Sequence, residues 1–230
     1  MKREFGKYVS LNIFGMLGLS CYILADTFFV SAKMGADGLT ALNLAISIYS
    51  FINGTGLMIG IGGGTKYSIY RSRREEEKGN RVFTAALVMG VLIGIILFAV
   101  GIFATRPLSM LLGAEGKIIE MTTVYLRTIL CFSPCFICNN IFLAFVRNDG
   151  NPRLSMIGML VGSFSNVVLD YVFMFPMGMG LAGAALATAA SPIVSILICS
   201  IHFCQKKNTV QFAKSRPSVR MLTASCQLGV

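Results

Sequence analysis

The chain has 230 residues, of which 55% are hydrophobic and only 13% are charged. Soluble domains usually carry about 25% charged residues, so this composition excludes an ordinary water-soluble domain. A net charge of +10 is also found in nucleic-acid-binding proteins. Here, however, the basic residues flank long uncharged stretches, which is the pattern that orients a protein across a membrane. Composition and charge therefore indicate a multi-pass membrane protein with no nucleic-acid partner.

The long apolar stretches predict transmembrane helices, because a helix needs roughly 20 apolar residues to cross a bilayer core of about 30 Å. The first stretch is too long for a signal peptide and lacks a small-residue cleavage site. We expect an all-α integral membrane fold, a six-transmembrane-helix bundle. Its spans are expected at about residues 8–31, 39–70, 82–105, 121–146, 154–176 and 181–203. Residues 205–230 are polar and basic at first, and we interpret them as a cytoplasmic linker followed by the truncated start of a seventh helix.

The distribution of basic residues predicts the orientation. With the amino terminus in the cytoplasm, sixteen of the twenty basic residues fall in inner segments. The positive-inside rule therefore favours both termini in the cytoplasm, and we expect the cell (plasma) membrane as the location. The four basic residues that fall outside are Lys33, Arg106, Lys117 and Arg127.

Two of the ten acidic residues, Asp26 and Asp170, lie inside expected spans. An ionised carboxylate in the bilayer costs several kcal/mol, so such a residue normally faces a cavity or a partner and is a functional hypothesis by default. The alternative is a structural acid that holds two helices together through hydrogen bonds. We favour the functional interpretation for both carboxylates.

Polar residues near Asp170 extend this hypothesis to a cluster. Asn166 precedes Asp170 by four residues and shares its helical face. Thr188 lies in the next span, in a stretch of small residues that allows close approach. Burial in a medium of low dielectric disfavours the charged carboxylate, which suits a proton relay. The unprotonated oxygens of Asp26 and Asp170 could instead bind sodium, and the sequence leaves proton and sodium as alternatives.

Other candidate sites are weaker. Residues 60–66 are glycine-rich but lack the Gly-Lys-Ser/Thr order of a phosphate loop, and the lone His202 is expected to be an interfacial residue. Cys131, Cys135 and Cys138 share a face but are expected to be packing residues, not metal ligands. The surroundings of Asp26 and Asp170 do not fit an intramembrane aspartic protease. The sequence therefore predicts no enzyme, no cofactor and no further metal site.

Three stretches resemble the multidrug and toxic compound extrusion (MATE) family. They read ADTFFV at residues 25–30, FVRNDGNPR at 145–153, and NVVLDYVF at 166–173 followed by GMGLAGAALAT at 178–188. Their order and spacing agree with the amino-terminal lobe of that family, over nearly the whole chain. The family has twelve helices in two lobes, so the resemblance implies the amino-terminal half of such a transporter, with the carboxy-terminal lobe missing.

The resemblance also implies a function. Members of the family expel organic cations and other small amphipathic compounds by proton- or sodium-coupled antiport. Asp26 would be the principal ion-coupling carboxylate and Asp170 its partner, with Asn166 and Thr188 completing the network. Two alternatives remain open at this point: a lipid-linked oligosaccharide flippase of the same superfamily, and a non-transporting membrane scaffold. Besides its substrate and a second lobe, membrane lipid is the expected partner.

Overall fold

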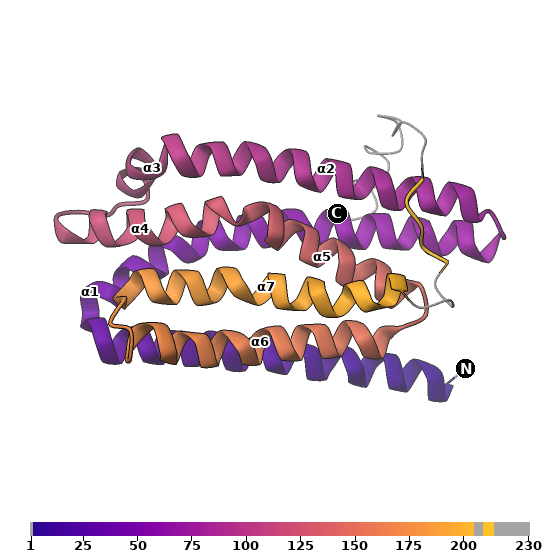
Figure 1. Ribbon diagram of the computed structural model, residues 1–230, viewed down its shortest axis with the longest axis horizontal. Coiled ribbons are helices and arrows are strands. Elements are labelled where there is room, and N and C mark those ends of the chain that lie inside the picture. The colour runs from indigo at the N-terminus through magenta and orange to yellow at the C-terminus, as the bar shows by residue number, and fades with distance from the viewer. Residues whose placement is uncertain (1, 205–208, 214–230) are drawn as a thin grey trace.

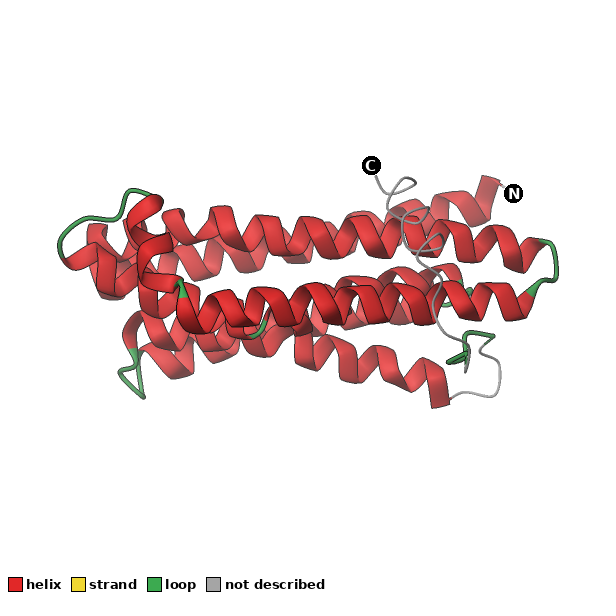
Figure 2. Cartoon of the chain, turned by 90° about the horizontal axis from the view of Figure 1, so that it is seen from above, coloured by secondary structure: helices red, strands yellow, loops and turns green. Residues whose placement is uncertain are grey.

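The structure is a computed structural model that describes residues 2–204 and 209–213. All regular secondary structure in these ranges is helical. The long helices lie side by side in an elongated bundle (Figures 1 and 2). Their bounds are α1 (Lys2–Ser72), α2 (Glu76–Phe103), α3 (Thr105–Leu111), α4 (Lys117–Cys131), α5 (Ser133–Asn148), α6 (Pro152–Met174) and α7 (Gly180–Cys204).

Helix α1 consists of two arms joined at Gly35. This residue has φ 65° and ψ −153°, a conformation that is not helical and that side chains with a Cβ rarely adopt. The first arm runs from the amino terminus along the bundle, and the second runs back beside it (Figure 1). The sequence ranges 8–31 and 39–70 thus lie on different arms.

A second break separates α4 from α5, whose axes differ in direction by 49°. Pro134 stands in the first turn of α5, and because it has no N–H it cannot continue the hydrogen-bond pattern of α4 into α5. The sequence range 121–146 therefore covers two helices that form one bent element.

Four helices in the described part of the chain are long and apolar enough to cross a membrane, or five when α4 and α5 count as one bent span. This count treats α1 as a single helix. The two arms of α1 on either side of Gly35 run in opposite directions along the bundle (Figure 1). The all-α membrane bundle expected from the sequence is confirmed.

Small residues allow these helices to approach closely. A Cβ on Gly94 of α2 would lie 2.6 Å from Pro134 Cα of α5. On α6, Gly158 and Gly162 face α7, where a Cβ would meet Cys199 Sγ and the Ser191 carbonyl oxygen, each at 3.1 Å. The hydrophobic effect does not drive helices together in lipid. Close van der Waals packing of this kind is therefore a main contribution to helix association.

The two ends of the bundle differ in charge. One end, called the basic end below, holds the α1–α2 turn, the α5–α6 loop and the end of α7 (Figure 1). The opposite end holds the Gly35 turn, α3 and the α6–α7 turn. The inner segments expected from the sequence thus meet at one end, and their described basic residues there include Arg71, Arg73, Arg74, Lys78, Arg81, Arg147 and Arg153. Residues 205–208 and 214–230, with the expected start of a seventh helix, lie outside the described residues.

Candidate functional site

Asp26 and Asp170 are buried inside the bundle. The first arm of α1 carries Asp26, which is 7% exposed, and α6 carries Asp170, which is fully buried. In the part of the chain that the structure describes, Oδ1 of each carboxylate lacks a hydrogen-bond partner. The two groups are also close enough to interact electrostatically. Buried polar atoms are almost always paired, so these two carboxylates are candidates for binding a proton or a cation.

Asn166 connects Asp170 to the neighbouring helix. It is fully buried one turn before Asp170 on α6. In one orientation of its amide, Nδ2 donates to Asp170 Oδ2 at 3.2 Å and the oxygen accepts from the Thr188 backbone N–H at 3.1 Å. In the other, Nδ2 donates to Thr188 Oγ1 at 3.4 Å. In both orientations Asn166 joins α6 to α7, as the sequence reasoning had placed it.

The small residues before Thr188 explain how α7 comes this near. Gly183 has so little room that a Cβ would lie 2.9 Å from Phe173 Cβ of α6. Ala184 and Ala185 are fully buried in the same turn. Larger side chains here would push Thr188 away from Asn166, so the packing of α6 on α7 sets the geometry of the polar cluster.

The structure adds tyrosines that the sequence reasoning missed. Tyr22 is buried one turn before Asp26, and its hydroxyl hydrogen-bonds that of Tyr49 at 2.6 Å. Tyr125 of α4 is buried beside Thr188 and near both carboxylates. Four-residue spacing from Asp26 is a signal that could have found Tyr22. Nothing in the sequence pattern marks Tyr125, because its proximity depends on how α4 packs.

An amide pair extends the polar interior from Tyr49. Asn53, one turn further along α1, donates from Nδ2 to the Tyr49 carbonyl oxygen at 3.1 Å. Its Oδ1 accepts from Asn140 Nδ2 of α5, also at 3.1 Å. The bundle interior therefore carries hydrogen-bonding groups on α1 and α5 as well as around the two carboxylates.

A third buried carboxylate, Asp149, lies at the basic end in the α5–α6 loop. Its Oδ1 accepts from Tyr67 Oη at 2.6 Å and pairs with Arg71 Nη1 at 3.1 Å. Its Oδ2 accepts from His202 Nε2 at 2.7 Å and from the Thr209 backbone N–H at 3.0 Å. Burial alone would raise the pKa of this carboxyl, but hydrogen bonds from its neighbours outweigh burial and lower it.

His202 therefore has a specific partner. The sequence predicted an interfacial histidine, and the residue does lie at the end of α7, but it is buried against Asp149. The sequence pattern gave no reason to pair these two residues.

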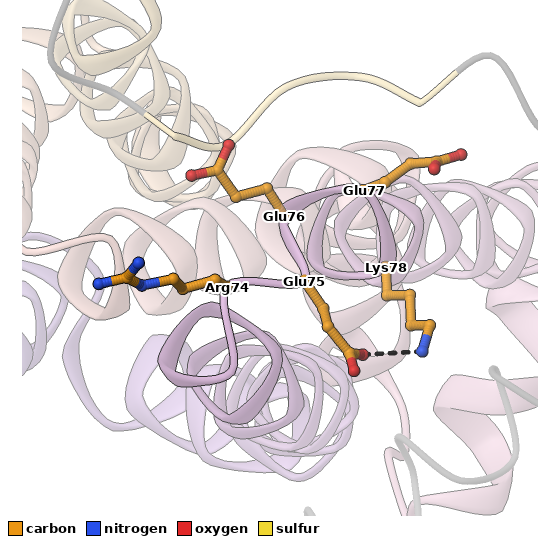
Figure 3. Close-up of a pocket in the computed structure, with 5 residues that line it drawn as sticks. All are labelled: Arg74, Glu75, Glu76, Glu77 and Lys78. Carbon is orange, nitrogen blue, oxygen red and sulfur yellow. Dashed lines mark ion pairs between the residues drawn. The ribbon is translucent and has the colours of Figure 1, made fainter.

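A surface hollow lies at the α1–α2 turn, lined by residues 74–78 (Figure 3). Arg74, with φ 60°, makes the tight turn. Lys78 Nζ pairs with Glu75 Oε2 at 2.8 Å, whereas the side chains of Glu76 and Glu77 point away from this pair (Figure 3). Exposed ion pairs of this kind contribute little, and the hollow shows no convergent groups that would form a binding site.

Among the described residues, no group of three or more histidine, cysteine, aspartate or glutamate side chains could hold a metal ion. A cation at Asp26 and Asp170 would therefore depend on neighbouring hydroxyl, amide or carbonyl oxygens for its remaining ligands. Such oxygen ligands suit hard cations.

Comparison with known families identifies the family of this chain. A family model described as MatE matches residues 12–172, a range that includes Asp26, Asn166 and Asp170. The chain belongs to the MatE family. Thr188 lies beyond the matched range, and its link to this site comes from the structure through Asn166.

Curated relatives of this MatE chain are multidrug export proteins named MepA. One from Staphylococcus saprophyticus is 31% identical over 210 residues, which cover 90% of this chain and 47% of the relative. One from Staphylococcus aureus (strain MRSA252) is 26% identical over 211 residues, covering 91% and 47%. The chain thus spans about half the length of the curated relatives it matches.

Solved structures of the same family show the same fold. A MATE family transporter in an outward-facing conformation matches with a TM-score of 0.87 at 27% identity, over 96% of this chain and 50% of that one. An inward-facing structure matches with a TM-score of 0.85 at 26% identity, over 90% and 48%. A MOP superfamily transporter from Pyrococcus furiosus gives 0.87 at 27% identity, over 96% and 50%. The chain therefore matches about half of a transporter in each of these two conformations.

Proposed function

We propose that this chain forms the amino-terminal lobe of a secondary active multidrug exporter, which expels small amphipathic or cationic compounds in exchange for an inward-moving ion. Multidrug export is the activity for which its relatives are named, and this supports the proposal. The chain would act as a transporter component, not as an enzyme, and its partner would be a second lobe that completes the substrate cavity.

The observation that carries this proposal is the pair of buried carboxylates with unpartnered oxygens, Asp26 and Asp170. A stable structural role would pair those oxygens with donors, as Asp149 is paired at the basic end. An ion-coupling role instead requires that the oxygens remain available for the ion. Asn166 and Thr188 then hold Asp170 in place by linking α6 to α7.

The coupling ion is a proton or sodium. A proton would neutralise one carboxylate and relieve the repulsion between two buried negative charges. Sodium would instead bind both carboxylates together with hydroxyl or amide oxygens nearby. Either ion drives transport only if it binds one conformation of the transporter more tightly than the other.

The charge distribution supports an orientation with the basic end in the cytoplasm of the plasma membrane. Described basic residues gather there on the α1–α2 turn and the α5–α6 loop. In this orientation the chain that leaves α7 is cytoplasmic too.

The test is efflux of a fluorescent cation such as ethidium from cells that produce the two-lobe transporter containing this lobe. We expect Asp26→Asn to abolish ion-driven efflux while the protein remains in the membrane. The matched control is Asp37→Asn, because Asp37 is exposed near the Gly35 turn. Unimpaired efflux by Asp26→Asn would refute the coupling role.

The same assay distinguishes the ions. Efflux that stops when a protonophore is added, and persists without sodium, supports proton coupling. Efflux that requires a sodium gradient and resists the protonophore supports sodium coupling. Accumulation of a lipid-linked precursor in a deletion strain, without any loss of efflux, would favour a flippase instead.

A further inference from the structure

Residues 209–213, called the strap below, lie against the basic end of the bundle although they belong to no helix (Figure 1). Three of their backbone N–H groups donate to side chains of the lobe. Thr209 donates to Asp149 Oδ2 at 3.0 Å, Gln211 to Asn80 Oδ1 at 2.8 Å, and Ala213 to Thr84 Oγ1 at 2.9 Å. Donation from every second residue is the pattern of an extended chain bound along one edge.

Two of the three acceptors, Asn80 Oδ1 and Thr84 Oγ1, belong to α2. Asn80 and Thr84 are one helical turn apart and therefore share a face. Thr84 Oγ1 also donates to the Asn80 carbonyl oxygen at 3.0 Å, which leaves its lone pairs directed toward Ala213. The strap thus binds through its backbone to side chains that the helix presents in a row.

Apolar contacts hold the residues between these hydrogen bonds. Val210 is 1% exposed and belongs to the core of the bundle. The ring of Phe212 lies 5.4 Å from that of Phe83, which also stacks on Phe203 of α7 at 5.6 Å. Burying Val210 supplies a driving force that does not depend on the hydrogen bonds.

Asp149 anchors the first residue of the strap. Besides the backbone bond, the Thr209 hydroxyl donates to Asp149 Oδ1 and also lies 2.7 Å from Tyr67 Oη. Hydrogen bonds to an ionised group are about twice as strong as neutral ones. The same carboxylate binds Arg71 of α1 and His202 of α7, so it ties the strap to both helices at one point.

We propose that the basic end of this lobe is a docking surface for an extended peptide, that its occupant is the strap of the same chain, and that Asp149 fixes it there. The chain consequently leaves the lobe from a fixed position on α2, and not freely from the end of α7. This inference does not depend on the proposed transport function, because it concerns only how the strap after α7 is bound to the lobe.

The test is hydrogen–deuterium exchange, at the resolution of single amides, on the full chain in detergent. We expect the Thr209, Gln211 and Ala213 amides to exchange at least about tenfold more slowly than in an unstructured peptide. Asp149→Asn should raise all three rates by about tenfold, because the neutral amide binds Thr209 less strongly. Asp37→Asn, at an exposed carboxylate near the other end, should leave them unchanged.

Two further variants keep the test decisive if Asp149→Asn fails to fold. Asn80→Ala should speed exchange of the Gln211 amide the most, and Thr84→Val should speed exchange of the Ala213 amide the most, because each variant removes the acceptor of that amide. The proposal is overturned if the strap amides of the unmodified chain exchange at the unstructured rate. It is equally overturned if a folded Asp149→Asn variant, or both α2 variants, leave the exchange of the strap unchanged.

Discussion

His202 Nε2 lies 2.7 Å from Asp149 Oδ2, although the two residues are 53 positions apart in the sequence. The hydrogen bonds of the neighbouring Asn151 indicate which nitrogen of the His202 ring carries the proton. Asn151 Oδ1 accepts from the Leu154 backbone N–H at the start of α6, so its Nδ2 faces His202 Nδ1 at 3.4 Å. His202 Nδ1 therefore accepts, and its Nε2–H donates to Asp149. One imidazole thus connects the cap of α6 to the carboxylate that binds α1 and the strap.

Removing the imidazole should destabilise the basic end. We expect His202→Ala to lower the free energy of unfolding by about 1–3 kcal/mol, because a buried charged acceptor loses a donor. The measurement is the thermal unfolding midpoint in detergent. Cys204→Ala is the matched control, since Cys204 is exposed at the end of the same helix. Equal midpoints for His202→Ala and the control would contradict the prediction.

The Asp149 carboxylate should make the free energy of unfolding depend on pH. Burial raises its pKa, but hydrogen bonds from Thr209, Tyr67 and His202 outweigh burial and hold the pKa below the ordinary value of an aspartate. A carboxyl whose pKa is lowered by folding stabilises the folded state above its unfolded pKa, and this contribution is lost as the pH falls through the folded pKa. The unmodified chain should therefore be more stable than Asp149→Asn at neutral pH, and the difference should shrink as the pH falls from the unfolded pKa of the carboxyl through its lowered folded pKa.

Unfolding midpoints of the two proteins, measured in detergent from about pH 6 downwards, check this sign. A stability difference that grows as the solution becomes more acidic would contradict it. So would a difference that disappears well above the unfolded pKa of the carboxyl.

Two glycines offer a matched test of helix packing. Gly94→Ala should destabilise the bundle by about 1–3 kcal/mol, because the new methyl would meet the backbone of Pro134 and push α2 from α5. A Cβ on Gly54 meets nothing within 4 Å. Gly54→Ala should thus be neutral or stabilise the helix by up to about 1 kcal/mol. Unfolding in a denaturing detergent compares the two, and equal effects would show that close approach at Gly94 is unimportant.

Tyr125 should contribute to ion coupling through its hydroxyl. It is buried beside Thr188 and near both carboxylates, so Tyr125→Phe removes a polar neighbour while keeping the ring. We expect the ion concentration needed for half-maximal efflux to change by about fivefold, as for the loss of one hydrogen bond. Tyr171→Phe is the control, because Tyr171 adjoins Asp170 in sequence but is 54% exposed. A variant with unchanged ion dependence would exclude Tyr125 from the coupling site.

Much of the candidate site was visible in the sequence. Asp26 and Asp170 stood out because carboxylates are rare inside apolar spans, and helical spacing placed Asn166 on the face of Asp170. The structure brings Asn166, Asp170 and Thr188 into one hydrogen-bonded group, and it places Asp26 within electrostatic reach. The role of these four residues in coupling stays a prediction until efflux is measured.

Residues that meet only through tertiary packing were missed. Tyr125 belongs to α4, whose orientation depends on the 49° bend between α4 and α5. Asp149 appeared in the sequence only as part of a loop motif. Its partners Tyr67 and His202 lie 82 and 53 positions away, and no local periodicity relates residues so far apart.

The sequence by itself determined that the chain is a helical membrane bundle with a basic end, because the bilayer excludes charge and unpaired backbone groups over a fixed thickness. It also determined that two carboxylates lie within that thickness. Only the tertiary structure decided which groups surround them, where α1 turns back at Gly35, and how Asp149 gathers α1, α7 and the strap. The physical reason is that hydropathy acts along the chain, whereas hydrogen bonds and close packing depend on distances between segments remote in sequence.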